Sequence, residues 1–180
     1  MNRKGIHSVP FVVNALSVVV MANALSLMSA TTVNAGALSG PGVDITVEPG
    51  DIPESWTVAN SAELTLDPGA QATTITLFSL GTVNINSATT STILAQDGFV
   101  NINAGSSVVS TNNAGLTLAS NFGEDSESIA IVEDSSISGF RLGVFQASGS
   151  QLTLTGSSVY GRDNGANGLV DGGVGVGNRG

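Results

Sequence analysis

The chain of 180 residues contains no cysteine and only one histidine, His7. The absence of cysteine excludes a disulfide framework, a thiolate metal site and attachment through a lipidated cysteine. Because His7 lies in an N-terminal segment that we expect to be removed, the remainder has no base for a Ser-His or Cys-His arrangement and lacks the ligand types of most transition-metal sites. We therefore predict no catalytic residue, no cofactor and no metal site.

Basic residues are also scarce. The chain has five of them against fourteen acidic residues, for a net charge of −9. All the acidic residues lie between Asp44 and Asp171, whereas two of the basic ones, Arg3 and Lys4, lie at the N-terminus. An acidic surface of this kind repels phosphate backbones, so nucleic acid is excluded as an expected partner.

The first 35 residues have the layout of a signal peptide. Arg3 and Lys4 precede an apolar run from Val9 to Met28, and small or polar residues follow it. This pattern predicts export through the Sec translocon, with cleavage after Ala35 or, as second choice, after Ala30. The alternative is a retained membrane anchor. Four polar residues interrupt the run and disfavour that alternative: Asn14, Ser17, Asn23 and Ser26.

The remaining composition favours short strands and turns. The chain has 23 glycines, with abundant Ser, Thr, Asn, Ala and Val. Apolar pairs at positions i and i+2, which place both side chains on one face of a strand, recur along it. The pairs predicted to stack in the core are Leu64 and Leu66, Val83 and Ile85, Val100 and Ile102, Ile129 and Ile131, and Leu152 and Leu154. Recurrence near twenty residues predicts an all-β fold, a parallel β-solenoid of about five coils.

Two stretches repeat most closely. Glu127–Gly139 (ESIAIVEDSSISG) and Ser150–Gly161 (SQLTLTGSSVYG) each contain an apolar pair, two serines, a β-branched residue and a glycine. The serines mark a corner of the coil. Further apolar residues predict a third side in three of the coils: Leu116 and Leu118, Leu142 and Val144, and Leu169 and Val170.

We expect residues 36–60 to form an N-terminal capping segment and residues 61–180 to form the solenoid, because a first coil needs a cover. Trp56 closes the apolar end or, alternatively, offers a platform for carbohydrate. The long coil after Val100 predicts an outward loop at Asn121–Ser128. The outward strand positions are Thr65, Asn84, Asn101, Ala130 and Thr153, and Asn84 and Asn101 are spaced to form an amide ladder.

Five carboxylates that lie close together in the sequence are a candidate catalytic or calcium site. They are Glu124, Asp125, Glu127, Glu133 and Asp134. We interpret this cluster as a solvated turn. The alternative is an acidic catalytic cluster, but no spacing typical of a calcium loop supports it.

The leader, the glycine-rich turns and the SIAIVEDSSISGF and SQLTLTGSSVYG repeats resemble the passenger region of pertactin-like bacterial autotransporters. The resemblance covers roughly residues 45–180 and is clearest from Val100 onward. It implies a right-handed parallel β-helix displayed on the cell surface or secreted, usually acting in adhesion and virulence. Such proteins continue into a longer stalk and an outer-membrane β-barrel. Neither is present here, so we expect an incomplete solenoid, from a fragment or a truncated gene, whose only membrane link is a barrel outside this chain.

These observations predict a non-enzymatic adhesive surface protein that passes through the periplasm and displays loops to a host or cell-surface receptor or glycan. The alternative is a fragment of a β-helical polysaccharide lyase or hydrolase. The scarcity of basic residues disfavours that alternative, because such enzymes place Arg or Lys beside their acidic cluster.

Overall fold

The computed structural model describes residues 36–119, 127–161 and 174–178. All of them belong to one compact unit, Val33–Gly180. The predicted signal peptide, including the cleavage site at Ala35, lies outside the described residues, as do residues 121–126 of the predicted outward loop. Every regular element of the described part is a β-strand, which confirms the all-β prediction.

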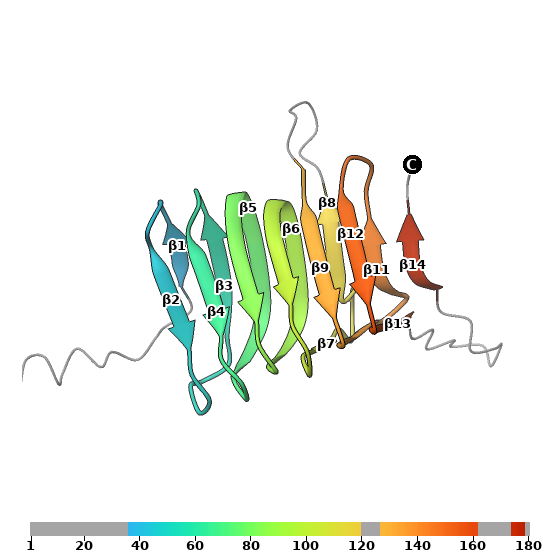
Figure 1. Ribbon diagram of the computed structural model, residues 1–180, viewed down its shortest axis with the longest axis horizontal. Helices are drawn as coiled ribbons and strands as arrows, with labels where there is room; N and C mark the ends of the chain where they lie inside the picture. The colour runs from blue at the N-terminus through green and yellow to red at the C-terminus, as the bar shows by residue number, and fades with distance from the viewer. Residues whose placement is uncertain (1–35, 120–126, 162–173, 179–180) are drawn as a thin grey trace, which may run out of the picture. The chain divides into compact units, whose positions relative to one another are not determined.

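The fourteen strands form a single sheet in which all pairings are parallel (Figure 1). In chain order they are β1 (Ala37–Ser39), β2 (Asp44–Val47), β3 (Glu54–Ala59), β4 (Glu63–Leu66), β5 (Gln71–Ile85), β6 (Thr89–Ile102), β7 (Ser107–Val109), β8 (Leu116–Ala119), β9 (Ile129–Glu133), β10 (Ser136–Gly139), β11 (Leu142–Gln146), β12 (Gln151–Thr155), β13 (Ser158–Gly161) and β14 (Val174–Asn178).

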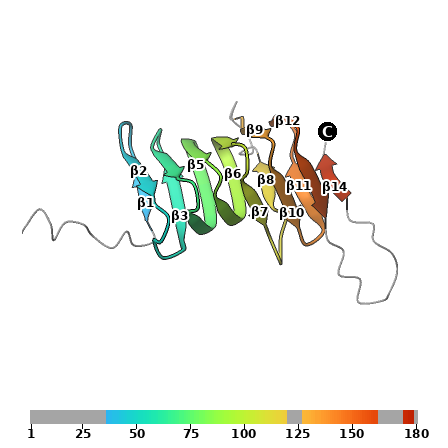
Figure 2. The same ribbon diagram turned by 60° about the horizontal axis from the view of Figure 1, so that its bottom comes forward.

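The strands stack in ladders that define three sides of a coil (Figure 2). Side one contains β2, β4, the end of β5, the end of β6, β9 and β12. Side two contains the starts of β5 and β6, followed by β7, β10 and β13. Side three contains β1, β3, the middles of β5 and β6, then β8, β11 and β14. This topology confirms the predicted parallel β-solenoid.

The six strands of side one correspond to about six coils, one more than the apolar pairs predict. The extra coil comes from residues 37–59, which were expected to form a cap. They supply β1, β2 and β3 to the same ladders as the later coils. Ile45 and Val47 of β2 lie in register with Leu64 and Leu66, so this coil extends the core.

The corner between sides three and one is turned by residues in the left-handed region of φ. Asn60 and Ser61 occupy it in one coil, and Ser79 and Leu80 occupy it in the next. The Ser61 amide donates to the Ser79 carbonyl over 3.2 Å, so equivalent corners stack on one another. Asparagine adopts this conformation more readily than most residues, whereas Leu80 adopts it at a steric cost, and these corners let the chain turn without breaking the ladders.

The core is a set of apolar columns inside the coil. Of the side chains predicted to stack on side one, six are fully buried: Leu64, Leu66, Val83, Ile85, Val100 and Ile102. Leu116, Leu118, Val108 and Ile137 from the other two sides meet them in one cluster.

The prediction that Ile129 and Ile131 face the core is wrong. β9 pairs with β6 so that Ala130 lies beside Val100 and Val132 beside Ile102. Ala130 and Val132 are therefore buried, whereas Ile131 is 41% exposed. The stretch Ile-Ala-Ile-Val is apolar at every position, so its pattern does not specify which face is inward, and a shift of one residue exchanges the two faces.

A buried serine at the start of β9 holds this register. The Ser128 hydroxyl accepts a hydrogen bond from the Asp97 amide (2.9 Å) and lies 3.0 Å from the Ala95 carbonyl oxygen and 2.7 Å from that of Ala119. These contacts attach the chain to two earlier strands directly after the long insertion. Ser128 was expected in the outward loop, but it is fully buried.

The last coil keeps the predicted orientation on side one. Leu152 and Leu154 lie in register with Ala130 and Val132 and so face inward. Among the described residues β12 has no further strand on its other side, which leaves Leu152 half-buried and Leu154 39% exposed.

The third side predicted from Leu116, Leu118, Leu142 and Val144 is present, and its register is set by Val144. Val144, not Leu142, pairs with Leu116, and it is buried while Leu142 is half-buried. The next strand of this side is β14, whose Val176 pairs with Val144. The predicted pair Leu169 and Val170 lies outside the described residues.

The amide ladder predicted on the outer face of side one is confirmed. The Asn101 side-chain amide donates to the Asn84 Oδ1 over 2.8 Å, and Asn84 in turn donates to Glu63. A second ladder joins Asn103 to Asn86 over 2.6 Å. In the next coil Ile131 lies beside Asn101. Because the Ile131 side chain is apolar, the amide ladder ends at Asn101.

The corrected register of β9 can be tested with neighbouring substitutions. We expect Ala130→Asp to lower the free energy of unfolding by more than about 4 kcal/mol, because it places an unpaired charge in a dry core. Ile131→Asp, on the outer face of the same strand, should cost about 1 kcal/mol or less. Chemical denaturation of the two variants distinguishes the registers, and the reverse order of stability would restore the original prediction.

Candidate functional site

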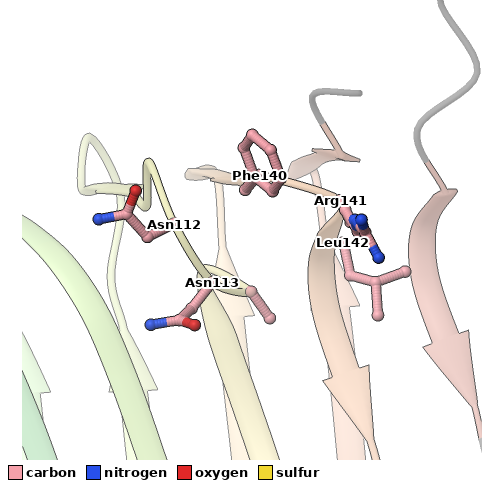
Figure 3. Close-up of a pocket in the computed structure, with 6 residues that line it drawn as sticks. Asn112, Asn113, Phe140, Arg141 and Leu142 are labelled. Atoms are coloured by element: carbon pink, nitrogen blue, oxygen red, sulfur yellow. The ribbon is translucent and has the colours of Figure 1, made fainter. Parts of the chain in front are cut away.

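The described part of the chain has a pocket at the corner between sides two and three. In the third and fourth coils β5 and β6 run through this corner without a break. In the next coils the strand is divided, so that loop 110–115 joins β7 to β8 and loop 140–141 joins β10 to β11. The pocket between them, here called the corner pocket, has a volume of about 420 Å³ (Figure 3). Its lining residues are Asn112, Asn113, Ala114, Phe140, Arg141 and Leu142.

Hydrogen bonds hold the two loops together. The Phe140 amide donates to the Asn113 carbonyl over 2.8 Å, and the Ser110 amide donates to the Ser138 carbonyl over 2.9 Å. The Ser110 hydroxyl also accepts from the Asn113 amide over 3.1 Å, which closes the first loop on itself. The pocket is therefore built on backbone contacts between successive coils.

Two glycines allow this close approach. A Cβ atom at Gly139 would collide with the Leu142 carbonyl oxygen and would lie 2.8 Å from the Asn113 carbonyl oxygen. A Cβ at Gly115 would lie 2.7 Å from the Ser138 carbonyl oxygen. Both positions exclude a larger residue on steric grounds, so the glycines determine how near the two loops lie.

The side chains around the pocket combine three chemistries. Phe140 supplies a half-buried aromatic ring, Asn112 and Asn113 supply exposed amides, and Arg141 supplies an exposed guanidinium group. Figure 3 shows the two asparagines on one loop and Phe140, Arg141 and Leu142 on the neighbouring one.

Arg141 is the only cationic residue in the described part of the chain, and none of the lining residues is acidic. These side chains offer a ligand an aromatic ring for stacking, amides for hydrogen bonding and one positive charge.

The acidic cluster considered from the sequence is not assembled in the structure. Glu124 and Asp125 lie outside the described residues. Glu127 precedes β9 and accepts a hydrogen bond from the Gln151 side chain (2.8 Å), whereas Glu133 and Asp134 lie at the far end of that strand. Six residues of extended chain span about 20 Å. Within the described ranges no three or more His, Cys, Asp or Glu side chains form a group that could hold a metal ion.

Trp56 belongs to the core. Its side chain is only 4% exposed and packs in the same cluster as Val58 and Ile75. Of the two interpretations raised by the sequence, the structure supports the one in which the tryptophan fills the apolar interior of an early coil, and an indole in this position offers no face to a ligand.

The sequence analysis missed the corner pocket, although a signal for it exists. The Ser-Ser-Val and Ser-Ser-Ile motifs place Ser107 beside Ser136 in the side-two ladder. Asn112 and Asn113 follow the first motif, and Phe140 and Arg141 follow the second at nearly the same distance. Aligning the motifs would have placed these four residues at one corner of adjacent coils.

Two adjacent substitutions test how the corner is built. We expect Gly139→Ala to destabilise the fold by about 2 to 4 kcal/mol, because its methyl group would force the two loops apart. Ser138→Ala should be neutral or stabilising by about 1 kcal/mol, because the buried Ser138 hydroxyl has no hydrogen-bond partner in the described part of the chain. Thermal unfolding of both proteins measures the difference, and a larger loss for Ser138→Ala would contradict this account.

Comparison of the chain with protein-family models, with curated proteins and with solved structures finds no match. In the described ranges, no helix has the length and apolar character needed to cross a membrane.

Proposed function

We propose that this protein is an exported surface protein of the autotransporter-passenger kind, a structural and adhesive β-helix that recognises a receptor or glycan and has no catalytic activity. The observation that carries the proposal is the corner pocket, where two loops from adjacent coils present an aromatic ring, two amides and a guanidinium group without an acidic residue.

The architecture supports a recognition role. Parallel ladders satisfy the backbone hydrogen bonds of each coil, so the column is rigid, and loops between its sides vary in length at modest entropic cost. Residues on such loops are held in position by the ladders on either side. Loops 110–115 and 140–141 are held in this way by β7, β8, β10 and β11.

The N-terminal pattern supports export. Arg3 and Lys4, the apolar run Val9–Met28 and the small residues up to Ala35 have the order of a secretory leader. In this proposal the Sec translocon carries the chain across the inner membrane. The protein then reaches the cell surface, held there through an outer-membrane barrel, or is secreted.

Export can be tested with the full chain carrying a C-terminal epitope in a Gram-negative host. We expect the mature protein in the periplasmic or surface fraction to begin at Gly36, as read by N-terminal sequencing. Val18→Arg should block export, because a charge in the apolar run opposes insertion. Val9→Leu, which keeps the apolar character, is the matched control. Protein that retains Met1 in the membrane fraction would overturn this part of the proposal.

Adhesion can be tested with the purified mature protein. We expect labelled protein to bind host-cell surfaces saturably, and we expect Arg141→Gln together with Phe140→Ala to reduce binding at least tenfold, because both side chains line the corner pocket. Thr153→Ala, exposed in the last coil, is the control. Binding that the double variant leaves unchanged contradicts recognition through the corner pocket.

Calcium-dependent release of unsaturated or reducing sugar from pectin or alginate would favour the alternative of a polysaccharide lyase or hydrolase.

A further inference from the structure

The position of Arg141 distinguishes the corner pocket from the rest of the surface. The full chain carries a net charge of −9, and Arg141 is the only cation among residues 36–119, 127–161 and 174–178. It lines the pocket next to Phe140 in the chain, and Asn112 and Asn113 lie on the neighbouring loop (Figure 3). A single cation placed among neutral groups suits a ligand that has one negative charge and is otherwise neutral and polar.

Each lining group has a counterpart in a sugar. An aromatic ring such as that of Phe140 packs against the C–H face of a pyranose. The amides of Asn112 and Asn113 can donate and accept, as sugar hydroxyls require. The guanidinium of Arg141 is planar and donates two parallel hydrogen bonds to a carboxylate.

We propose that the corner pocket binds a carboxylated sugar unit, such as a uronate residue of an acidic glycan. This inference rests on the proposed recognition function and specifies the ligand of the corner pocket. A volume of about 420 Å³ lies within the range of about 300–1,000 Å³ that is usual for small-molecule sites. The ligand bridges two coils, with the amides on the loop before β8 and the ring and guanidinium on the loop before β11.

The negative charge of the rest of the protein does not prevent a carboxylated sugar from binding in the corner pocket. At physiological ionic strength, exposed charges more than about 8 Å away are largely screened. The lining contains no carboxylate that would compete for Arg141 or repel the ligand at close range. The negative charge of the protein does disfavour a highly charged polyanion. Outside the pocket, the described part of the chain has no cation that could pair with further negative charges of the ligand.

The test uses isothermal titration of the processed protein with three monosaccharide probes: methyl galacturonoside, which carries one carboxylate, its methyl ester, and methyl galactoside. We expect the acid to bind at least tenfold more tightly than the ester, because only the acid can pair with Arg141. The ester and the neutral galactoside should bind similarly, through the ring and the amides.

Three variants measure how much the charge, the bidentate geometry and the aromatic ring each contribute to the affinity. Arg141→Gln should reduce the affinity for the acid at least tenfold and leave that for the ester unchanged. Arg141→Lys should give an intermediate loss, because lysine keeps the charge but not the bidentate geometry. Phe140→Ala should weaken all three probes alike. As a control, Thr153→Ala, on side one of the last coil, should change none, and thermal unfolding checks that each variant is folded.

Equal affinity for acid and ester, an unchanged affinity in Arg141→Gln, or no binding of any probe at millimolar concentration would overturn the inference. The outcomes also distinguish a failure of the ligand assignment from a failure of the proposed function. If host cells bind the protein but galacturonate neither binds nor competes, recognition stands and the ligand assignment falls. If galacturonate binds as expected but the chain is not exported, the ligand assignment stands and the surface role falls.

Discussion

The structure depends on the backbone hydrogen bonds that join equivalent strands of successive coils. The Asn103 amide, for example, donates to the Ile85 carbonyl over 2.9 Å, as the Asn86 amide does to Leu66 over 3.0 Å one coil earlier. Since a parallel ladder fixes which residues lie beside each other, it also fixes the columns of side chains. Inside the coil these columns are apolar and dry, and outside they allow the amides of Asn84 and Asn101 to form a ladder.

This constraint acts on the sides of the coil and leaves the corners variable. Nine residues separate β8 from β9, and the buried hydroxyl of Ser128, the last of them, attaches the chain to the carbonyls of Ala95 and Ala119. At another corner the continuous strand β6 gives way to separate strands joined by loops, and the corner pocket lies between two such loops. The regular ladders thus position irregular segments, and the groups suited to recognition lie on those segments.

The corner pocket combines an aromatic ring, two amides and a guanidinium group. In the proposed recognition these groups match the shape, the hydroxyls and the single negative charge of a ligand. The carboxylates that suggested a catalytic alternative are separated by the length of β9 where the structure describes them. The proposed role in adhesion and the proposed uronate ligand use the same few side chains, so substitutions at the exposed Arg141 and the half-buried Phe140 test both.

The sequence by itself determined the fold class, because apolar pairs with a period of two that recur near every twenty residues can bury their side chains only by stacking coils. It also determined the inward faces of β4, β5 and β6, where polar residues alternate with Leu64, Val83 and Val100. It did not determine the face of β9, since Ile129–Val132 is apolar throughout, nor that residues 37–59 form a coil. The tertiary structure decided those features and the hydrogen bond between Phe140 and Asn113, because they depend on which strand lies beside which. Such contacts join residues about twenty to thirty positions apart, and no local pattern specifies them.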